Sequence, residues 1–175
     1  HLVSIEGEPE GNRLNDGCID PQGTLWFGSM DDSESDPTGA IYSAKATPAG
    51  LDITRHDAGY IVSNGPAVSP DGRTLYACHS STQTIYAFEI EADGTLARRR
   101  VFAHVEPAYP DGIVCDGAGA LWCCMFAGGR IIRFAPDGTV MEEIAMPCTY
   151  PTKLAFGGDD LRTAYVTSAR RDLTA

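Results

Sequence analysis

Hydrophobic and polar positions repeat four times along the chain in the same order. Each repeat begins with a polar cluster, continues through a tight turn and ends in an apolar run that contains an aromatic residue. This pattern is typical of strands separated by turns. The aromatic residues are Trp26, Tyr76, Trp122 and Tyr165, so the repeats are 50, 46 and 43 residues apart. A period in the forties predicts an all-β fold, a β-propeller with one four-stranded blade per repeat.

Helical arrays have similar periods, but they need apolar residues at i, i+3, i+4 and i+7 over long windows, which this sequence lacks. The pattern instead places a first inner strand pair at 18–30, a polar loop at 31–39 and the next strand at 40–43. Residues 1–12 are expected to be the tail of an earlier strand and a Gly-rich connection. Outer strands are expected at 51–54, 96–102 and 140–144, with hairpin turns at 92–95 and 135–138.

The fourth repeat ends at 167–169 with no outer strands after it. Four repeats of this kind leave strand edges open rather than closing a ring. We therefore expect residues 1–175 to be part of a single β-propeller domain, truncated at both ends and inactive as an excerpt. A self-sufficient ring of four blades is the alternative.

Charge and cysteine content limit the partners and the compartment. Thirteen basic and 24 acidic residues give a net charge of −11, which argues against a nucleic-acid partner and suits either a cation site or an acidic surface. No apolar run has the roughly 18 residues of a membrane helix. The cysteines lack C-x-x-C spacing and lie in apolar runs, so we expect reduced thiols and a cytoplasmic protein. They are Cys18, Cys78, Cys115, Cys123, Cys124 and Cys148.

The polar positions that begin each repeat carry the candidate chemistry. Asn15, Asn64, Asp111 and Thr152 each stand five residues before the turn position of their repeat. Equivalent positions of a propeller point toward its central channel, so two Asn and one Asp are expected to converge there. Their oxygens are the hard ligands that Ca²⁺, Mg²⁺ or Mn²⁺ prefer. Asn-Gly and Asp-Gly are also ordinary turn sequences, which is the alternative explanation.

Several motifs follow one another in order along the whole chain. They are Arg13-Leu14-Asn15-Asp16-Gly17, Trp26-Phe27-Gly28-Ser29-Met30, Ser63-Asn64-Gly65, Ser69-Pro70-Asp71-Gly72-Arg73-Thr74-Leu75-Tyr76, Pro110-Asp111-Gly112 and Phe156-Gly157-Gly158. Together they resemble the SMP-30/gluconolactonase/regucalcin-like family. That resemblance implies a six-bladed propeller, of which this chain covers about four blades, with one divalent metal in its channel. It also implies hydrolysis of sugar (aldono-) lactones to the corresponding acids.

The resemblance also implies residue roles. Asn64 and Asp111 match metal ligands, Asn15 matches a residue near metal and substrate, and Arg13 matches a substrate-binding arginine. We expect Ca²⁺, with Zn²⁺, Mn²⁺, Mg²⁺ or iron as alternatives. Asp111 is the expected catalytic base, and water activated by the metal is the alternative. The family's glutamate ligand has no counterpart here, because Glu6 and Glu8 lie too close to Arg13.

Three further features bear on substrate choice. His79 stands where the family often has aspartate, and a single His is more often structural than part of a site. Asp31, Asp32 and the loop after them are candidates for contacts with substrate hydroxyls, although a solvated loop is more common. Two other functions stay open: a calcium-dependent esterase or organophosphatase-like propeller, and a non-enzymatic calcium-binding propeller.

Overall fold

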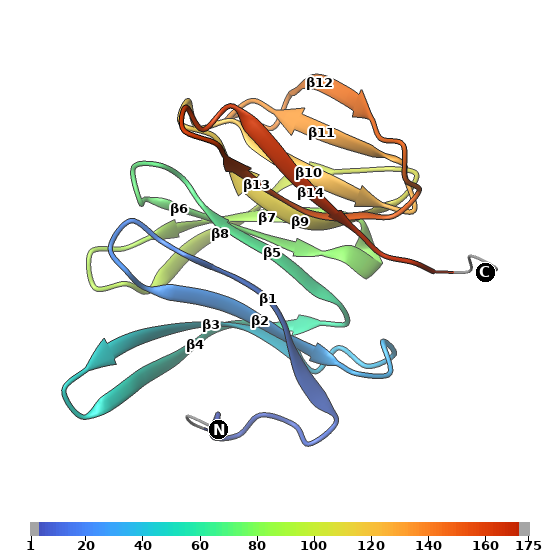
Figure 1. Cartoon of the computed structure of the whole chain (residues 1–175). Helices are drawn as coiled ribbons and strands as arrows, with labels where there is room; N and C mark the ends of the chain where they lie inside the picture. Colours follow the sequence, from blue (N-terminus) through green and yellow to red (C-terminus); the bar gives the residue numbers. More distant parts are fainter. Residues whose placement is uncertain (1–3, 172–175) are drawn as a thin grey trace.

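The computed structural model describes residues 4–171, and antiparallel strands make up nearly all regular structure in that range (Figure 1). Within it lie three four-stranded sheets and one two-stranded sheet, each a meander of strands that follow one another in sequence. The first sheet contains β1 (Asn12–Ile19), β2 (Leu25–Asp31), β3 (Gly39–Thr47) and β4 (Gly50–Tyr60). The second contains β5 (Ser63–Val68), β6 (Thr74–His79), β7 (Thr84–Ile90) and β8 (Leu96–His104), with the 3₁₀ turn η1 (Ser80–Thr82) after β6.

The third sheet contains β9 (Tyr109–Cys115), β10 (Leu121–Phe126), β11 (Arg130–Phe134) and β12 (Val140–Ala145). The fourth contains β13 (Pro151–Gly157) and β14 (Thr163–Ser168). The first strands of successive sheets, β1, β5, β9 and β13, contact one another in that order. The sheets are therefore successive blades of a β-propeller, as the sequence period predicts.

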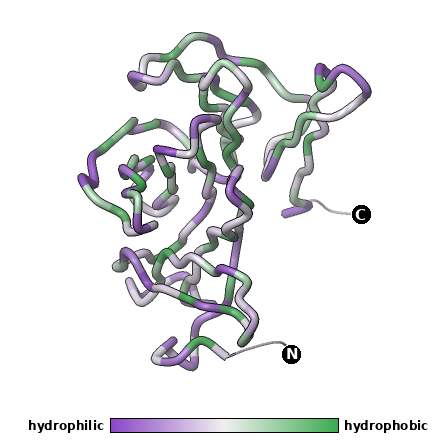
Figure 2. The backbone as a smooth tube through the Cα atoms, turned by 90° about the vertical axis from the view of Figure 1, so that its left-hand side faces the viewer, coloured by the Kyte–Doolittle hydropathy of each residue, from purple (hydrophilic) through white to green (hydrophobic). Residues whose placement is uncertain are grey.

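The middle strands bury both faces, which explains why they read as unbroken apolar runs. Successive side chains of a strand point to opposite faces. In β6, Leu75 and Ala77 pack with Trp26 of the first sheet, whereas Tyr76 and Cys78 pack toward the third. In Figure 2, hydrophobic and hydrophilic stretches accordingly alternate along the whole tube rather than gathering in one block.

An aspartate secures the turn between the first two strands of two blades. Asp20 accepts hydrogen bonds from the backbone N–H of Thr24 at 2.8 Å and from Trp26 Nε1 at 2.9 Å. Asp116 does the same for Ala120 and Trp122, at 3.0 Å each. One carboxylate thus closes the hairpin and fixes the large aromatic residue that packs against the next blade.

Two sequence-based bounds are wrong. The first inner strand begins at Asn12 rather than at Cys18, because the polar cluster itself pairs with β2 through Arg13 and Met30. Residues 4–11 form turns instead of the tail of a strand, and residues 1–3 lie outside the described range. The other predicted strands are present, with β3 and β4 longer than expected.

No helix within residues 4–171 is long and apolar enough to cross a membrane.

We expect Asp20→Ala to lower the melting temperature clearly, because it leaves the buried indole N–H of Trp26 and the Thr24 N–H without their acceptor. A loss of about 2 kcal/mol corresponds to roughly 4–8 °C for a domain of this size. The measurement is thermal unfolding followed by circular dichroism. Asp93→Ala is the matched control, since the Asp93 carboxylate closes an exposed outer turn through Thr95. Equal losses in the two variants would contradict the proposed role of Asp20.

Candidate functional site

Each first strand of a blade carries one extra residue at its polar position. In β1, Leu14 pairs with Ser29 and Gly17 with Phe27, so three steps on β1 match two on β2. The same irregularity occurs in β5 between Asn64 and Ala67, in β9 opposite 123–125 and in β13 between Pro151 and Lys153. Bulges of this kind redirect side chains away from the regular alternation of a strand. The polar residues therefore lie at bulges within the strands and not before them.

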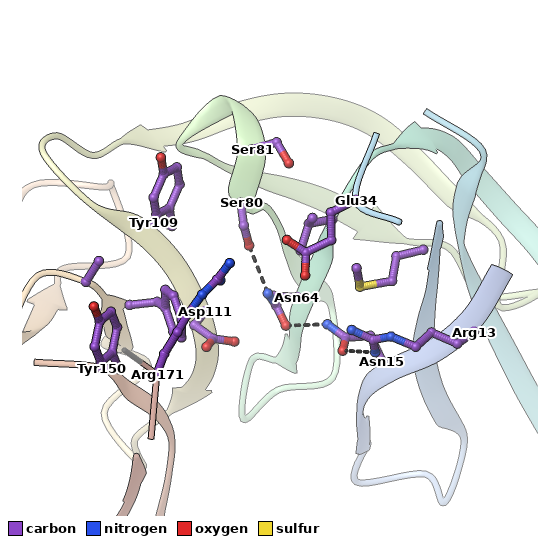
Figure 3. Close-up of a pocket in the computed structure, with 14 residues that line it drawn as sticks. Arg13, Asn15, Glu34, Asn64, Ser80, Ser81, Tyr109, Asp111, Tyr150 and Arg171 are labelled. Carbon is purple, nitrogen blue, oxygen red and sulfur yellow. Dashed lines mark hydrogen bonds between the residues drawn. The ribbon is translucent and has the colours of Figure 1, made fainter. Parts of the chain in front are cut away.

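Three of the four polar positions line one cavity of about 640 Å³. Asn15 reaches it from β1, Asn64 from β5 and Asp111 from β9, and Arg13 lies on its wall (Figure 3). Thr152 is not part of the wall, and its hydroxyl is instead 2.8 Å from that of Thr167. The structure thus brings together Arg13, Asn15, Asn64 and Asp111, and leaves out the fourth position.

A chain of hydrogen bonds connects three blades along the cavity wall, and the dashed lines in Figure 3 show the part of it from Arg13 to Ser80. Arg13 donates to Asn15 Oδ1 at 2.6 Å, and Asn15 Nδ2 donates to Asn64 Oδ1 at 2.6 Å. Asn64 Nδ2 donates to Ser80 Oγ at 2.9 Å, and Ser80 donates to the carbonyl oxygen of Pro110 at 2.6 Å. Both amide orientations are therefore set by their neighbours. Ser80 is a member of this network that the sequence pattern did not single out.

The loop after β2 holds Arg13 in place. Asp32 forms an ion pair with Arg13 Nε at 2.9 Å. Asp31 is buried and accepts hydrogen bonds from Ser33, Ser35 and the backbone N–H of Asp36, which lower its pKa far below the usual range. Asp31 therefore shapes the loop, while Glu34, at a φ of +56°, lies on the cavity wall.

His79 is buried away from the cavity wall. Its Nε2 accepts a hydrogen bond from the backbone N–H of Ile61 at 3.1 Å, and the centroid of its ring lies 5.2 Å from that of Tyr60. Burial lowers the pKa of His79, with Arg99 adding to the effect. These contacts give His79 a structural role.

Asp111 has an unusual electrostatic environment. Burial raises the pKa of its carboxyl to about 7, and the negative charge of Asp16 acts in the same direction. Lys153 and the Gly112 backbone N–H oppose the rise without cancelling it. Lys153 Nζ itself lies 2.6 Å from Asp16 Oδ2. The ionised form of Asp111 is therefore short of positive charge, which is the condition that a bound cation relieves.

The donor set fits a hard divalent cation. Within residues 4–171 no group of three or more His, Cys, Asp or Glu side chains is arranged to hold a metal, so the candidate ligands are two amides and one carboxylate. The oxygens of Asn15 and Asn64 each accept one hydrogen bond, and an amide oxygen has a second lone pair available. Amide and carboxylate oxygens are the ligands that Ca²⁺ and Mg²⁺ prefer. Asn15, Asn64 and Asp111 are therefore candidate oxygen ligands on the wall of one cavity.

Comparison with known proteins identifies the family. A model of the SMP-30/gluconolactonase/LRE-like region matches residues 1–170, and the chain belongs to that family, as its motifs predict. It is 37% identical over 169 residues to the 6-deoxy-6-sulfogluconolactonase of Pseudomonas putida, covering 95% of this chain and 57% of that protein. It is 34% identical over 178 residues to the L-arabinolactonase of Azospirillum brasilense, covering 97% of this chain and 57% of that protein.

A solved structure shows the same fold. The crystal structure of the calcium-binding protein regucalcin from Agrobacterium tumefaciens superposes with a TM-score of 0.88 at 30% identity. The match covers 97% of this chain and 58% of that one. The chain therefore spans less than two thirds of the length of these relatives.

We expect the stability of the metal-free protein to depend on the charge of Asp111. Its pKa is about 7 in the folded state and 3.8 in its ordinary range, so the proton is held more tightly when the protein is folded. The stability that this proton supplies is complete below the ordinary pKa and is lost as pH rises through about 7. In the presence of chelator, Asp111→Asn should therefore raise the melting temperature more at pH 8 than at pH 5.

The test compares the change in melting temperature caused by Asp111→Asn at pH 8 with the change at pH 5. Any effect of the amide that does not depend on pH cancels in this difference. Asp52→Asn, at an exposed position of β4, is the control and should show the same effect at both pH values. A melting difference for Asp111→Asn that does not vary with pH would contradict the raised pKa.

Proposed function

We propose that the full-length protein hydrolyses sugar (aldono-) lactones to the corresponding acids with the help of one divalent metal ion. The observation that carries the proposal is the convergence of Arg13, Asn15, Asn64 and Asp111 on one cavity. The names of the two relatives described above, a sulfogluconolactonase and an arabinolactonase, support the substrate class. Ca²⁺ is the proposed ion, supported by the all-oxygen donor set and by the calcium-binding relative.

The proposed reaction opens the lactone ring with water. Water attacks the carbonyl carbon, the bond from that carbon to the ring oxygen breaks, and the ring oxygen leaves as a hydroxyl after taking up a proton. Asn15, Asn64 and Asp111 would hold the divalent ion, which would supply Lewis-acid polarisation of the lactone carbonyl when bound. Asp111 accepts the proton of the attacking water and is the group that returns a proton to the ring oxygen.

Arg13 is proposed to bind the substrate. Its guanidinium is fixed from two sides, by Asp32 at 2.9 Å and by Asn15 at 2.6 Å, so its direction is set before substrate arrives. A planar fork of N–H donors suits ring hydroxyls or the oxyanion that develops on the carbonyl. Asn15 forms hydrogen bonds with both Arg13 and Asn64, which supports its proposed role beside both the substrate and the metal.

We also propose a cytoplasmic location. All six cysteines lie in the described range as free thiols, with Cys78, Cys123 and Cys124 buried. Unpaired thiols in such number are typical of a reducing compartment.

Asp111→Ala should abolish Ca²⁺ binding by the full-length protein, because it removes the only carboxylate proposed as a ligand from this chain. Asn64→Ala should weaken binding strongly, by about 10–100-fold, since it removes one oxygen and the hydrogen bond that orients Asn15. Isothermal titration calorimetry with CaCl₂ measures both. Asp52→Ala, an exposed carboxylate of β4, is the control. Undiminished affinity in the Asp111 variant would overturn the metal-site assignment.

Full-length protein should release acid from five- or six-membered aldonolactones in a pH-indicator assay, and chelator should stop the reaction. Arg13→Met should raise KM, because the guanidinium contacts the substrate rather than the metal. Activity on aryl esters without activity on sugar lactones would favour the calcium-dependent esterase instead. Calcium binding without either activity would favour a non-enzymatic calcium-binding propeller.

A further inference from the structure

The side chain of Lys153 connects the last described blade to the first two. It belongs to β13, yet its Nζ lies 2.6 Å from Asp16 Oδ2 of β1 and 3.3 Å from the carbonyl oxygen of Gly65 of β5. Asp16 and Lys153 are 137 residues apart in the sequence. Their side chains are only 24% and 31% exposed, so the ion pair is largely shielded from solvent.

The stem of the same side chain passes over a third strand. A Cβ atom at Gly112 of β9 would clash with Lys153 Cδ and with the carbonyl oxygen of Thr152. Gly112 therefore leaves the space that the lysine stem occupies. Through one side chain, β13 contacts β1, β5 and β9, the three strands that carry Asn15, Asn64 and Asp111.

The contacted residues share one position. Asp16, Gly65 and Gly112 directly follow Asn15, Asn64 and Asp111, at the bulge of each strand. A displacement of any of these three backbones would move the neighbouring ligand. An ammonium group is compact and donates up to three hydrogen bonds in different directions, which suits a contact to several strands at once.

We propose that Lys153 is a positioning residue for the cation site, holding the three ligand-bearing bulges at the spacing that a divalent ion requires. This inference rests on the proposed function, since the ion is the one proposed above. Lys153 does not itself contact the ion, and it acts through Asp16, Gly65 and Gly112. Thr152, the polar position of β13, does not line the cavity. The contribution of β13 to the site is therefore Lys153.

Removal of Lys153 should change Ca²⁺ affinity in opposite directions, depending on whether the residue acts by its charge or by positioning the ligands. A positive charge beside a cation site repels the ion, so its loss by Coulomb's law alone would strengthen binding. Loss of a positioning contact weakens binding instead, typically by 10–100-fold for residues behind a metal ligand. The sign of the change therefore separates the two roles.

The test uses full-length protein with Lys153→Met and the double variant Asp16→Asn/Lys153→Met. The double variant keeps the approximate shapes and removes both charges of the ion pair, so it avoids the uncompensated Asp16 charge that the single variant leaves. Lys45→Met is the matched control, because Lys45 is the only other lysine of the chain and is exposed. Thermal unfolding first establishes that each variant is folded at the temperature of measurement.

Two readouts follow, one without metal. In chelator, amide hydrogen exchange should be faster in the double variant at 15–17, 64–65 and 111–113 and unchanged in β3 and β7. Calorimetry with CaCl₂ should show at least about tenfold weaker binding in both Lys153 variants and wild-type affinity in Lys45→Met. Unchanged exchange at the three bulges, or wild-type or tighter Ca²⁺ binding by the folded double variant, would overturn the inference. Wild-type protein that binds no Ca²⁺ would refute the proposed function, while the exchange measurement still decides whether Lys153 holds the bulges.

Discussion

Burial of both faces of the middle strands of the four-stranded sheets is the constraint on which the rest of this structure depends. The side chains of β6 alternate between the two neighbouring blades, so this strand is buried only when a blade packs on each side of it. The first strands of the blades must then lie side by side. Residues that are 40 to 50 positions apart in sequence thereby come to one cavity. The site is a consequence of how the blades stack, and no single blade contains it.

The bulges let polar side chains of the first strands face the cavity although the blades are packed against one another. A regular strand would point the polar side chains to the faces of the sheet, where the neighbouring blades pack. One extra residue in each first strand redirects them at the same level of the fold. The hydrogen bonds from Arg13 through Asn15 and Asn64 to Ser80 then satisfy groups that would otherwise be costly at a partly buried position. Asp111 is the exception, and its raised pKa reflects a charge that the surrounding residues do not fully balance.

The same arrangement separates Asp111, the candidate ligand and base, from the acids that close turns and loops. Asp20, Asp31 and Asp116 each accept several hydrogen bonds from nearby residues, so their carboxylates serve turns and loops. Asp111 differs because its surroundings come from distant strands and disfavour its ionised form. Acidic residues of similar sequence context thus have different roles, and burial with nearby charge distinguishes them.

Sequence alone determined the repeat, the strand-rich fold and the turns, because turn chemistry and alternation are local properties. The repeat also singled out Asn15, Asn64 and Asp111 as equivalent polar positions, and the resemblance of its motif to the family singled out Arg13. The sequence pattern placed the start of the first strand too late, since a bulge lets a polar segment pair as a strand. Only the tertiary structure decided that Thr152 lies off the cavity wall, that His79 is structural and that Lys153 reaches Asp16. The raised pKa of Asp111 was likewise decided by the tertiary structure alone. These features depend on distances between different blades, which no local pattern of residues encodes.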